Sequence, residues 1–173
     1  TASEIEESLK KIIPEITSYF KLISSEPIRN MGTIAGNIVN ASPIGDLSIM
    51  FLALNAFITL NTRTVPLKDF FLGYKRMDLK KGEFLVSIEF EIPLNPMLFN
   101  FEKVSKRTHL DIASVNSAIQ IRMDGAIVKE CYLSAGGVSP IPLYLIKTCN
   151  FLKGKAISSD IIIKANEIFL LIL

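Results

Sequence analysis

The stretch MGTIAGNIVNASPIGD, residues 31–46, combines small residues with a carboxylate that precedes an apolar run. Gly32, Ala35 and Gly36 let the main chain approach a ligand closely, so that several N–H groups can point into one concavity. Asp46 is expected at the N-cap or in the first turn of a buried helix. The stretch contains neither a Walker loop nor a GxGxxG motif. Its residues alone leave open a phosphate-binding loop or a close-packed turn between two helices.

Composition and charge exclude several classes of partner. The sequence has 173 residues, is 49% hydrophobic and carries a net charge of +2 with acids and bases interspersed. It can bury the core of one domain or two small ones, and it offers no basic surface for nucleic acid or an anionic membrane. Its apolar runs are too short to span a bilayer, so we expect a cytoplasmic protein. Cys131 and Cys149 are far apart and lack a CxxC pair, which predicts buried thiols and no metal site.

Helical patterns dominate the first half of the chain, and one strand follows them. Ser3 and Glu6 fit a capping box for a first helix, and Pro14 is expected to end that helix or begin a second. Residues 24–30 are expected to break the helical pattern. Residues 83–93 alternate as in a strand. The predicted buried face of that strand consists of Phe84, Val86, Ile88, Phe90 and Ile92.

A composition break at residues 93–96, PLNP, predicts a domain boundary. Three strands are expected beyond it, at 99–106, 113–122 and 126–135, with a hairpin turn at Asp124 and Gly125. Helical patterns then run to the last residue given. The final apolar run, 168–173, is expected to dock against a partner or to belong to something longer.

The order of residues in the glycine-containing stretch is more specific than its composition. PIRNMGTIAGNIVNASPIGD, residues 27–46, closely resembles the second FAD-binding segment in the flavoprotein subunits of molybdenum hydroxylases, the xanthine dehydrogenase and carbon monoxide dehydrogenase family. Three more segments resemble that family in the same order. They are GEFLVSIEFEIP (82–93), FEKVSKRTHLDIASVNSAIQI (101–121) and LSAGGVSPIP (133–142).

This resemblance implies an α+β fold in two parts. Residues 1–95 would form the second half of an FAD-binding α/β domain. Residues 96–173 would form a small domain of antiparallel sheet and helices, like the C-terminal domain of CO dehydrogenase flavoproteins. The family's first, glycine-rich AGGT-like motif has no counterpart in these residues. The resemblance therefore implies a fragment or a shortened subunit, cut at both ends.

Carried over position by position, the resemblance also implies the cofactor ligands. Residues 33–37 would form the phosphate-side loop, and Asp46 would accept hydrogen bonds from the hydroxyl groups of the FAD. Ala35 replaces a glycine of the commonest loop. The implied set has no catalytic side chain and no metal ligand. It consists of Ile23, Thr33, Ile34, Ala35, Gly36, Asn37, Asp46, Leu85 and Lys103.

The function implied by the resemblance is that of an FAD-binding electron-transfer component of an oxidoreductase, active only with its partners. In that family FAD passes electrons from iron-sulfur clusters to NAD or another acceptor. A molybdenum-binding large subunit and an iron-sulfur small subunit would carry the other cofactors, and a homodimer could form through the apolar C-terminal helix. An alternative is a flavin-domain remnant that binds no FAD and serves as an assembly module. If the neighbouring coding sequence supplies the AGGT-like motif, the FAD-binding hypothesis is favoured. If the natural chain starts at Thr1, the assembly module is favoured.

Other polar residues have simpler interpretations. His109 is the single histidine and is expected on a loop, which excludes a Ser/His/Asp arrangement. Asp111 is expected to hold a turn by accepting backbone N–H bonds. Residues 136–137, a Gly-Gly pair, could form a second anion nest or a tight turn, and the turn is favoured. Glu89 and Glu91 are expected on a solvated strand face rather than as an acid/base pair.

Overall fold

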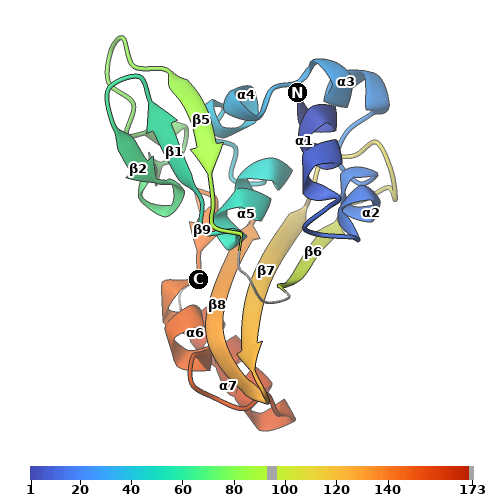
Figure 1. Cartoon of the computed structure of the whole chain (residues 1–173), viewed down its shortest axis with the longest axis vertical. Coiled ribbons are helices and arrows are strands. Elements are labelled where there is room, and N and C mark those ends of the chain that lie inside the picture. The colour runs from blue at the N-terminus through green and yellow to red at the C-terminus, as the bar shows by residue number, and fades with distance from the viewer. Residues whose placement is uncertain (93–96, 172–173) are drawn as a thin grey trace.

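The computed structural model describes residues 1–92 and 97–171. The helices are α1 (Ala2–Leu9), α2 (Ile16–Phe20), α3 (Glu26–Met31), α4 (Ile34–Val39), α5 (Asp46–Ala53), α6 (Ile146–Leu152) and α7 (Ser159–Leu170), with a 3-10 turn η1 (Leu67–Asp69). The strands are β1 (Phe57–Leu60), β2 (Thr64–Pro66), β3 (Phe71–Gly73), β4 (Arg76–Met77), β5 (Leu85–Glu89), β6 (Leu98–Val104), β7 (Val115–Asp124), β8 (Ile127–Gly136) and β9 (Leu143–Tyr144). This mixed architecture confirms the predicted α+β fold class (Figure 1).

The strands form small antiparallel sheets, with the orders β2-β1-β5, β3-β4 and β6-β7-β8-β9. The predicted hairpin is confirmed, because β7 and β8 pair antiparallel with Asp124 opposite Ile127. Gly125 in its turn has a φ of +57°, a conformation that glycine adopts without strain. In Figure 1, α6 and α7 lie beside the lower part of this sheet, far from α1 to α4.

Helix α5 joins the two halves of the molecule. Every residue of α5 except Asp46 is buried, as expected for a helix that is apolar all round. The helix packs against β7 and β8, and the Ser134 hydroxyl donates a hydrogen bond to the Ile49 carbonyl oxygen over 2.7 Å. Asp46 is the first residue of α5, so the predicted place of this carboxylate in the first turn is confirmed. The packing of α5 therefore fixes Asp46 relative to the long sheet.

The predicted buried face of the strand is wrong at three of its five positions. Phe84, Val86 and Ile92 are 60%, 59% and 58% exposed, whereas Leu85 packs against the core. Ile92 lies beyond the end of β5 at Glu89. For Phe84 and Val86 the cause is a bulge: Thr59 pairs with Ser87, but Leu60 pairs with Leu85, so one residue of β5 is extra. A one-residue shift moves every preceding side chain to the opposite face.

Two details at the N-terminus also differ from prediction. The capping box of α1 is formed by Thr1 and Glu4, not by Ser3 and Glu6, which have the same spacing. The segment 24–30 is not only a break, because Pro27 lies in the first turn of α3, where a missing N–H costs nothing. The predicted domain boundary at 93–96 lies outside the described residues.

The structure also bears on membrane and metal chemistry. Across residues 1–92 and 97–171, none of the helices is both long and apolar enough to cross a bilayer. In that same part of the chain, no group of three or more His, Cys, Asp or Glu side chains is placed to hold a metal ion. Cys131 and Cys149 are buried free thiols, as predicted. A hydrogen bond to Cys149, together with burial, raises the pKa of the Cys131 thiol.

An ion-pair cluster braces the turn between β1 and β2. The guanidinium of Arg63 contacts Asp78 over 2.6 Å and Glu83 over 2.9 Å. The hydrogen bond from Arg63, with further bonds from Thr62 and the Lys80 backbone, lowers the pKa of Glu83 to about 2. Since the usual pKa of a glutamate is higher, the folded state favours the charged carboxylate.

This cluster predicts a loss of stability in acid. A carboxyl group with a lower pKa in the folded state stabilises the fold above its unfolded pKa, and that contribution disappears as pH falls toward about 2. The free energy of unfolding should therefore fall between about pH 5 and pH 2. In the Glu83→Gln variant the free energy of unfolding should fall less steeply over the same range. Urea unfolding at a series of pH values measures both slopes. Equal slopes for the two proteins would contradict the role of Glu83.

Candidate functional site

A cavity of about 740 Å³ opens at the N-terminus of α5, and we call it the Asp46 cavity. Segments far apart in the sequence contribute to it: the chain after α2, the end of α4, the turn before α5, the end of β6 and the loop 107–113. Its volume is in the range of small-molecule sites. Its lining includes Ile23, Asn37, Ile44, Asp46, Lys103, Arg107, Asp111 and Ile112.

A buried ion pair forms one wall of the Asp46 cavity. The Lys103 ammonium lies 2.8 Å from Asp46 Oδ2 and also donates to the Leu22 carbonyl oxygen over 2.8 Å. The two side chains are only 3% and 12% exposed. A buried charge needs a partner, and here each charge neutralises the other. The pair ties β6 to the start of α5 and leaves a carboxylate at the cavity surface.

Residues 33–36 lie beside this cavity rather than in its lining. Thr33 is the N-cap of α4, and its hydroxyl accepts a hydrogen bond from the Gly36 N–H over 3.0 Å. The stretch predicted as a loop is thus helical from Ile34 onward. Thr33 and Gly36 are exposed, and Ile34 and Ala35 are half-buried. Their backbone N–H groups lie in the first turn of α4, where such groups have no partner within the helix.

Asn37 connects this first turn to the cavity. Its Oδ1 accepts hydrogen bonds from the Ser48 N–H over 3.3 Å and from the Ser48 hydroxyl over 3.2 Å. These bonds hold α4 against the first turn of α5. Gly45 packs closely against this contact, since a Cβ at residue 45 would be 3.3 Å from Asn37 Oδ1 and 3.2 Å from Ser48 Oγ.

The structure therefore brings together four of the residues predicted to bind the cofactor. Ile23, Asn37, Asp46 and Lys103 all line the Asp46 cavity. Leu85 does not line it: this half-buried side chain lies on β5 and packs against the main core.

The sequence pattern missed two groups in this site. The first is the loop 107–113, where Arg107 and Ile112 line the cavity. Asp111 accepts hydrogen bonds from the N–H groups of Arg107 and Ile112 over 2.9 and 3.0 Å, so its predicted turn-holding role is confirmed. The Arg107 side chain, with these backbone bonds, lowers the pKa of Asp111. His109 lies on the same loop, as expected, and its side chain is exposed.

The second missed group is Asn116 on β7. Its Nδ2 donates to Asp46 Oδ1 over 2.6 Å and to the Ile44 carbonyl oxygen over 3.1 Å. The period-two alternation of β7 places Asn116 on the same buried face as Ala118, and a polar residue on such a face was the available sequence signal. Its partner, however, is 70 residues away in sequence.

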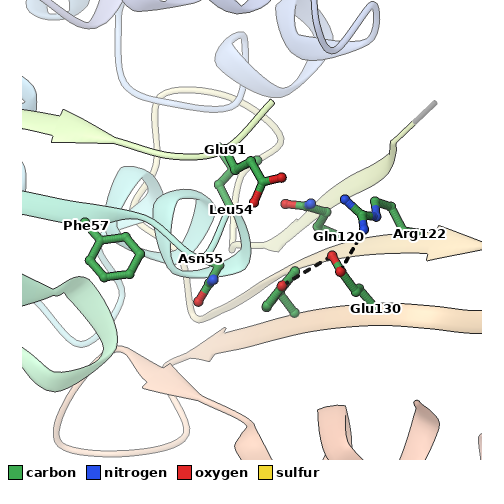
Figure 2. Close-up of a pocket in the computed structure, with 8 residues that line it drawn as sticks. Leu54, Asn55, Phe57, Glu91, Gln120, Arg122 and Glu130 are labelled. Carbon is green, nitrogen blue, oxygen red and sulfur yellow. Dashed lines mark hydrogen bonds and ion pairs between the residues drawn. The ribbon is translucent and has the colours of Figure 1, made fainter. Parts of the chain in front are cut away.

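A second, smaller cavity of about 70 Å³ lies on another part of the long sheet, and we call it the Gln120 cavity. Figure 2 shows Glu91, Gln120, Arg122 and Glu130 around it. Arg122 pairs with Glu130 over 2.7 Å, and Glu91 is exposed at the rim. Glu89 instead bonds to Thr59 and Ser87. The two glutamates therefore do not form an acid/base pair, as predicted.

The residues of the Asp46 cavity suit a flavin nucleotide. Ile23, Ile44 and Ile112 provide apolar surface for a flat ring system, while the Asp46 carboxylate can accept hydrogen bonds from hydroxyl groups. The exposed first turn of α4 adds N–H groups for a phosphate. Apolar walls with a few convergent polar groups are typical of cofactor sites.

Comparison with protein families gives two adjoining matches. Residues 1–94 match the model described as the FAD binding domain in molybdopterin dehydrogenase. Residues 101–170 match the CO dehydrogenase flavoprotein C-terminal domain.

Individual relatives agree with these matches. Xanthine dehydrogenase of Oryza sativa subsp. japonica is 34% identical over 176 residues, which cover 88% of this chain and 13% of the rice protein. The glyceraldehyde dehydrogenase medium chain of Sulfolobus acidocaldarius is 32% identical over 158 residues, which cover 89% of this chain and 56% of that protein. The chain thus spans little more than half of the second relative and a small part of the first.

A solved structure shares the fold. It is carbon monoxide dehydrogenase from Hydrogenophaga pseudoflava, in a form that lacks the Mo-pyranopterin moiety of the molybdenum cofactor. The match has a TM-score of 0.87 at 27% sequence identity and covers 95% of this chain and 58% of that chain. The likeness therefore extends across both halves of the molecule.

Proposed function

The chain belongs to the FAD-binding flavoproteins of the molybdenum hydroxylase family, and we propose that its Asp46 cavity holds part of the FAD. In this proposal Asp46 accepts hydrogen bonds from cofactor hydroxyl groups, and the ion pair with Lys103 holds that carboxylate in place. The first turn of α4, residues 33–37, faces the phosphates, and Ile23 contacts an apolar part of the cofactor. The resemblance alone supports a further contact of the cofactor with Leu85, which does not line the Asp46 cavity.

The observation that carries this proposal is the paired carboxylate at the cavity surface. Lys103 and Asn116 each bond to one oxygen of Asp46, so the carboxylate has a fixed direction. A carboxylate accepts several hydrogen bonds, so each of its oxygens has capacity left for a ligand. Such preorganised acceptors bind hydroxyl groups without a cost for reorientation.

We further propose that the chain serves as an electron-transfer component of an oxidoreductase. When bound, FAD would supply the redox chemistry that takes electrons from iron-sulfur clusters to NAD or another acceptor. The chain's own residues would bind and orient the flavin and shield one side of it from water. The molybdenum centre and the iron-sulfur clusters would lie on partner subunits or domains.

The proposal extends to domain organisation and partners. The two family matches, 1–94 and 101–170, support a division into residues 1–95 and 96–173. Helix α7 exposes Ile162, Ile163 and Leu170, each at least 48% exposed. Apolar side chains on one exposed helix support docking of this element against a partner subunit or a second copy.

FAD titration followed by flavin fluorescence tests the proposed function. The chain should be compared with a version extended at its N-terminus to supply the glycine-rich motif. Binding by the extended protein is expected. If the extended protein does not bind FAD, the flavoprotein proposal is overturned and the assembly-module alternative gains.

The same titration tests the place of α4 in the site. Gly36→Val should weaken FAD binding roughly tenfold, because its side chain would displace the Thr33 hydroxyl and block close approach to the first turn of α4. A Cβ at this position already lies 3.0 Å from Thr33 Oγ1. Glu91→Ala is the control, since Glu91 lines the Gln120 cavity, and it should bind FAD like the unchanged chain. Equal affinities of the two variants would refute the assignment of α4.

A further inference from the structure

Asn116 is a buried amide in a place where an apolar residue would be expected. The residue is 4% exposed and lies on the face of β7 that meets α5. Burying an amide is unfavourable unless its polar atoms find partners. Both known partners of Asn116 come from the segment that leads into α5: Asp46 Oδ1 over 2.6 Å and the Ile44 carbonyl oxygen over 3.1 Å. The two N–H groups of the amide are therefore both used.

The carboxylate of Asp46 is held from two neighbouring strands. Lys103 on β6 binds Oδ2, and Asn116 on β7 binds Oδ1. The two strands pair antiparallel, and Lys103 is directly opposite Asn116. The ammonium supplies the charge that Asp46 needs, whereas the amide adds no charge and supplies direction. Two bonds from two fixed strands leave the carboxylate little freedom to rotate.

Gly136 makes room for this arrangement. It is paired with Asn116 across β7 and β8. A Cβ at Gly136 would lie 2.1 Å from Asn116 Oδ1 and 2.7 Å from the Pro43 carbonyl oxygen. Asn116 Oδ1 itself is buried and has no hydrogen-bond partner within residues 1–92 and 97–171. An unpartnered buried acceptor is costly, so the amide orientation must be fixed by the two bonds that its nitrogen makes.

We propose that Asn116 is a positioning residue, which turns the Asp46 carboxylate toward the hydroxyl groups of the sugar-alcohol chain of FAD. This inference rests on the proposed function, because it assumes that Asp46 contacts the cofactor. It assigns Asn116 no direct contact with the flavin ring.

The first test separates the sugar-alcohol chain from the ring. Asn116→Leu should weaken binding of FAD and of riboflavin about tenfold, since one bond to a charged group is lost. Binding of lumiflavin, which has the ring without the sugar-alcohol chain, should not change. Ser134→Ala is the matched control, because it removes another buried bond between the long sheet and α5, and Ser134 does not line the Asp46 cavity. This control should bind all three flavins like the unchanged chain.

The second test uses pH and a variant of nearly the same shape. Asn116→Asp places a second carboxyl group against Asp46, so like-charge repulsion should weaken FAD binding about tenfold at pH 8. Binding should recover as the pH is lowered and the introduced carboxyl group takes up a proton. The other charged groups in contact with Asp46 or lining its cavity are Lys103, Arg107 and Asp111, and they are common to all variants. The unchanged chain and Ser134→Ala should therefore serve as reference profiles without this recovery.

The outcomes distinguish the two proposals. If the unchanged chain binds FAD and the Asn116 variants bind it equally well, the positioning role is overturned and the proposed function stands. If the variants lose all three flavins together and show no recovery at low pH, Asn116 is only structural and the inference fails. If neither the unchanged chain nor its N-terminally extended version binds any flavin, the proposed function fails and this inference fails with it.

Discussion

Lys103→Met is expected to lower the free energy of unfolding by about 3 kcal/mol and to weaken FAD binding more than tenfold. The ammonium of Lys103 contacts Asp46 over 2.8 Å, and its side chain is only 3% exposed. Methionine fills similar space but leaves the Asp46 carboxylate with no charged partner in a poorly hydrated place. The cost comes mainly from that uncompensated charge. Urea unfolding and FAD titration measure the two effects.

Two further variants test whether the losses of stability and FAD affinity arise from the Lys103–Asp46 ion pair. Lys106→Met removes an exposed lysine three residues farther along and should change neither quantity. Adding Asp46→Asn to Lys103→Met removes the uncompensated charge, so the double variant should regain part of the lost stability but no FAD affinity. If the two substitutions lower stability additively, the ion pair is not coupled as the structure implies.

The elements that could be predicted are those whose sequence pattern is local. The alternation in β7 and β8, with Gly125 in the turn between them, is complete within the hairpin, so strands and turn were both predicted. The buried face of β5 was not, because its bulge depends on pairing with β1. Helix α3 falls in segment 24–30, where a break is predicted, but a proline in the first turn does not end a helix.

The residues of the Asp46 cavity also differ in whether the local sequence could predict them. Asp46 could be predicted because a carboxylate before an apolar helix has a local reason to be there. Lys103 could be predicted as a site residue only from the family resemblance, because no local feature of the sequence distinguishes it from a solvated lysine on a strand. Asn116 and the loop 107–113 reach the site only through the antiparallel pairing of β6 with β7 and the packing of α5 on the long sheet. No spacing within one segment indicates contacts of that kind.

Gly137→Ala is expected to lower the free energy of unfolding by about 3 kcal/mol. Gly137 has a φ of +83°, and its N–H donates to the Pro43 carbonyl oxygen over 3.2 Å. A Cβ there would lie 2.3 Å from the Ser114 carbonyl oxygen and 3.3 Å from Ile44 Cγ2. The residue therefore closes the contact between the end of β8 and the turn that precedes α5. The pair does not form the tight turn that was favoured, because Gly136 is the last residue of β8, paired with Asn116, and the bend begins only at Gly137.

Gly154→Ala is the matched control for the cause of this loss. Gly154 has a nearly equal φ of +79°, but a Cβ there meets nothing within 4 Å. Its replacement should cost only the backbone strain, about 1 kcal/mol. The difference between the two variants in urea unfolding then measures the steric contact alone. Because that contact supports Ile44 and Asp46, Gly137→Ala should also weaken FAD binding, whereas Gly154→Ala should not. Equal losses of stability would mean that the end of β8 does not press against the turn before α5.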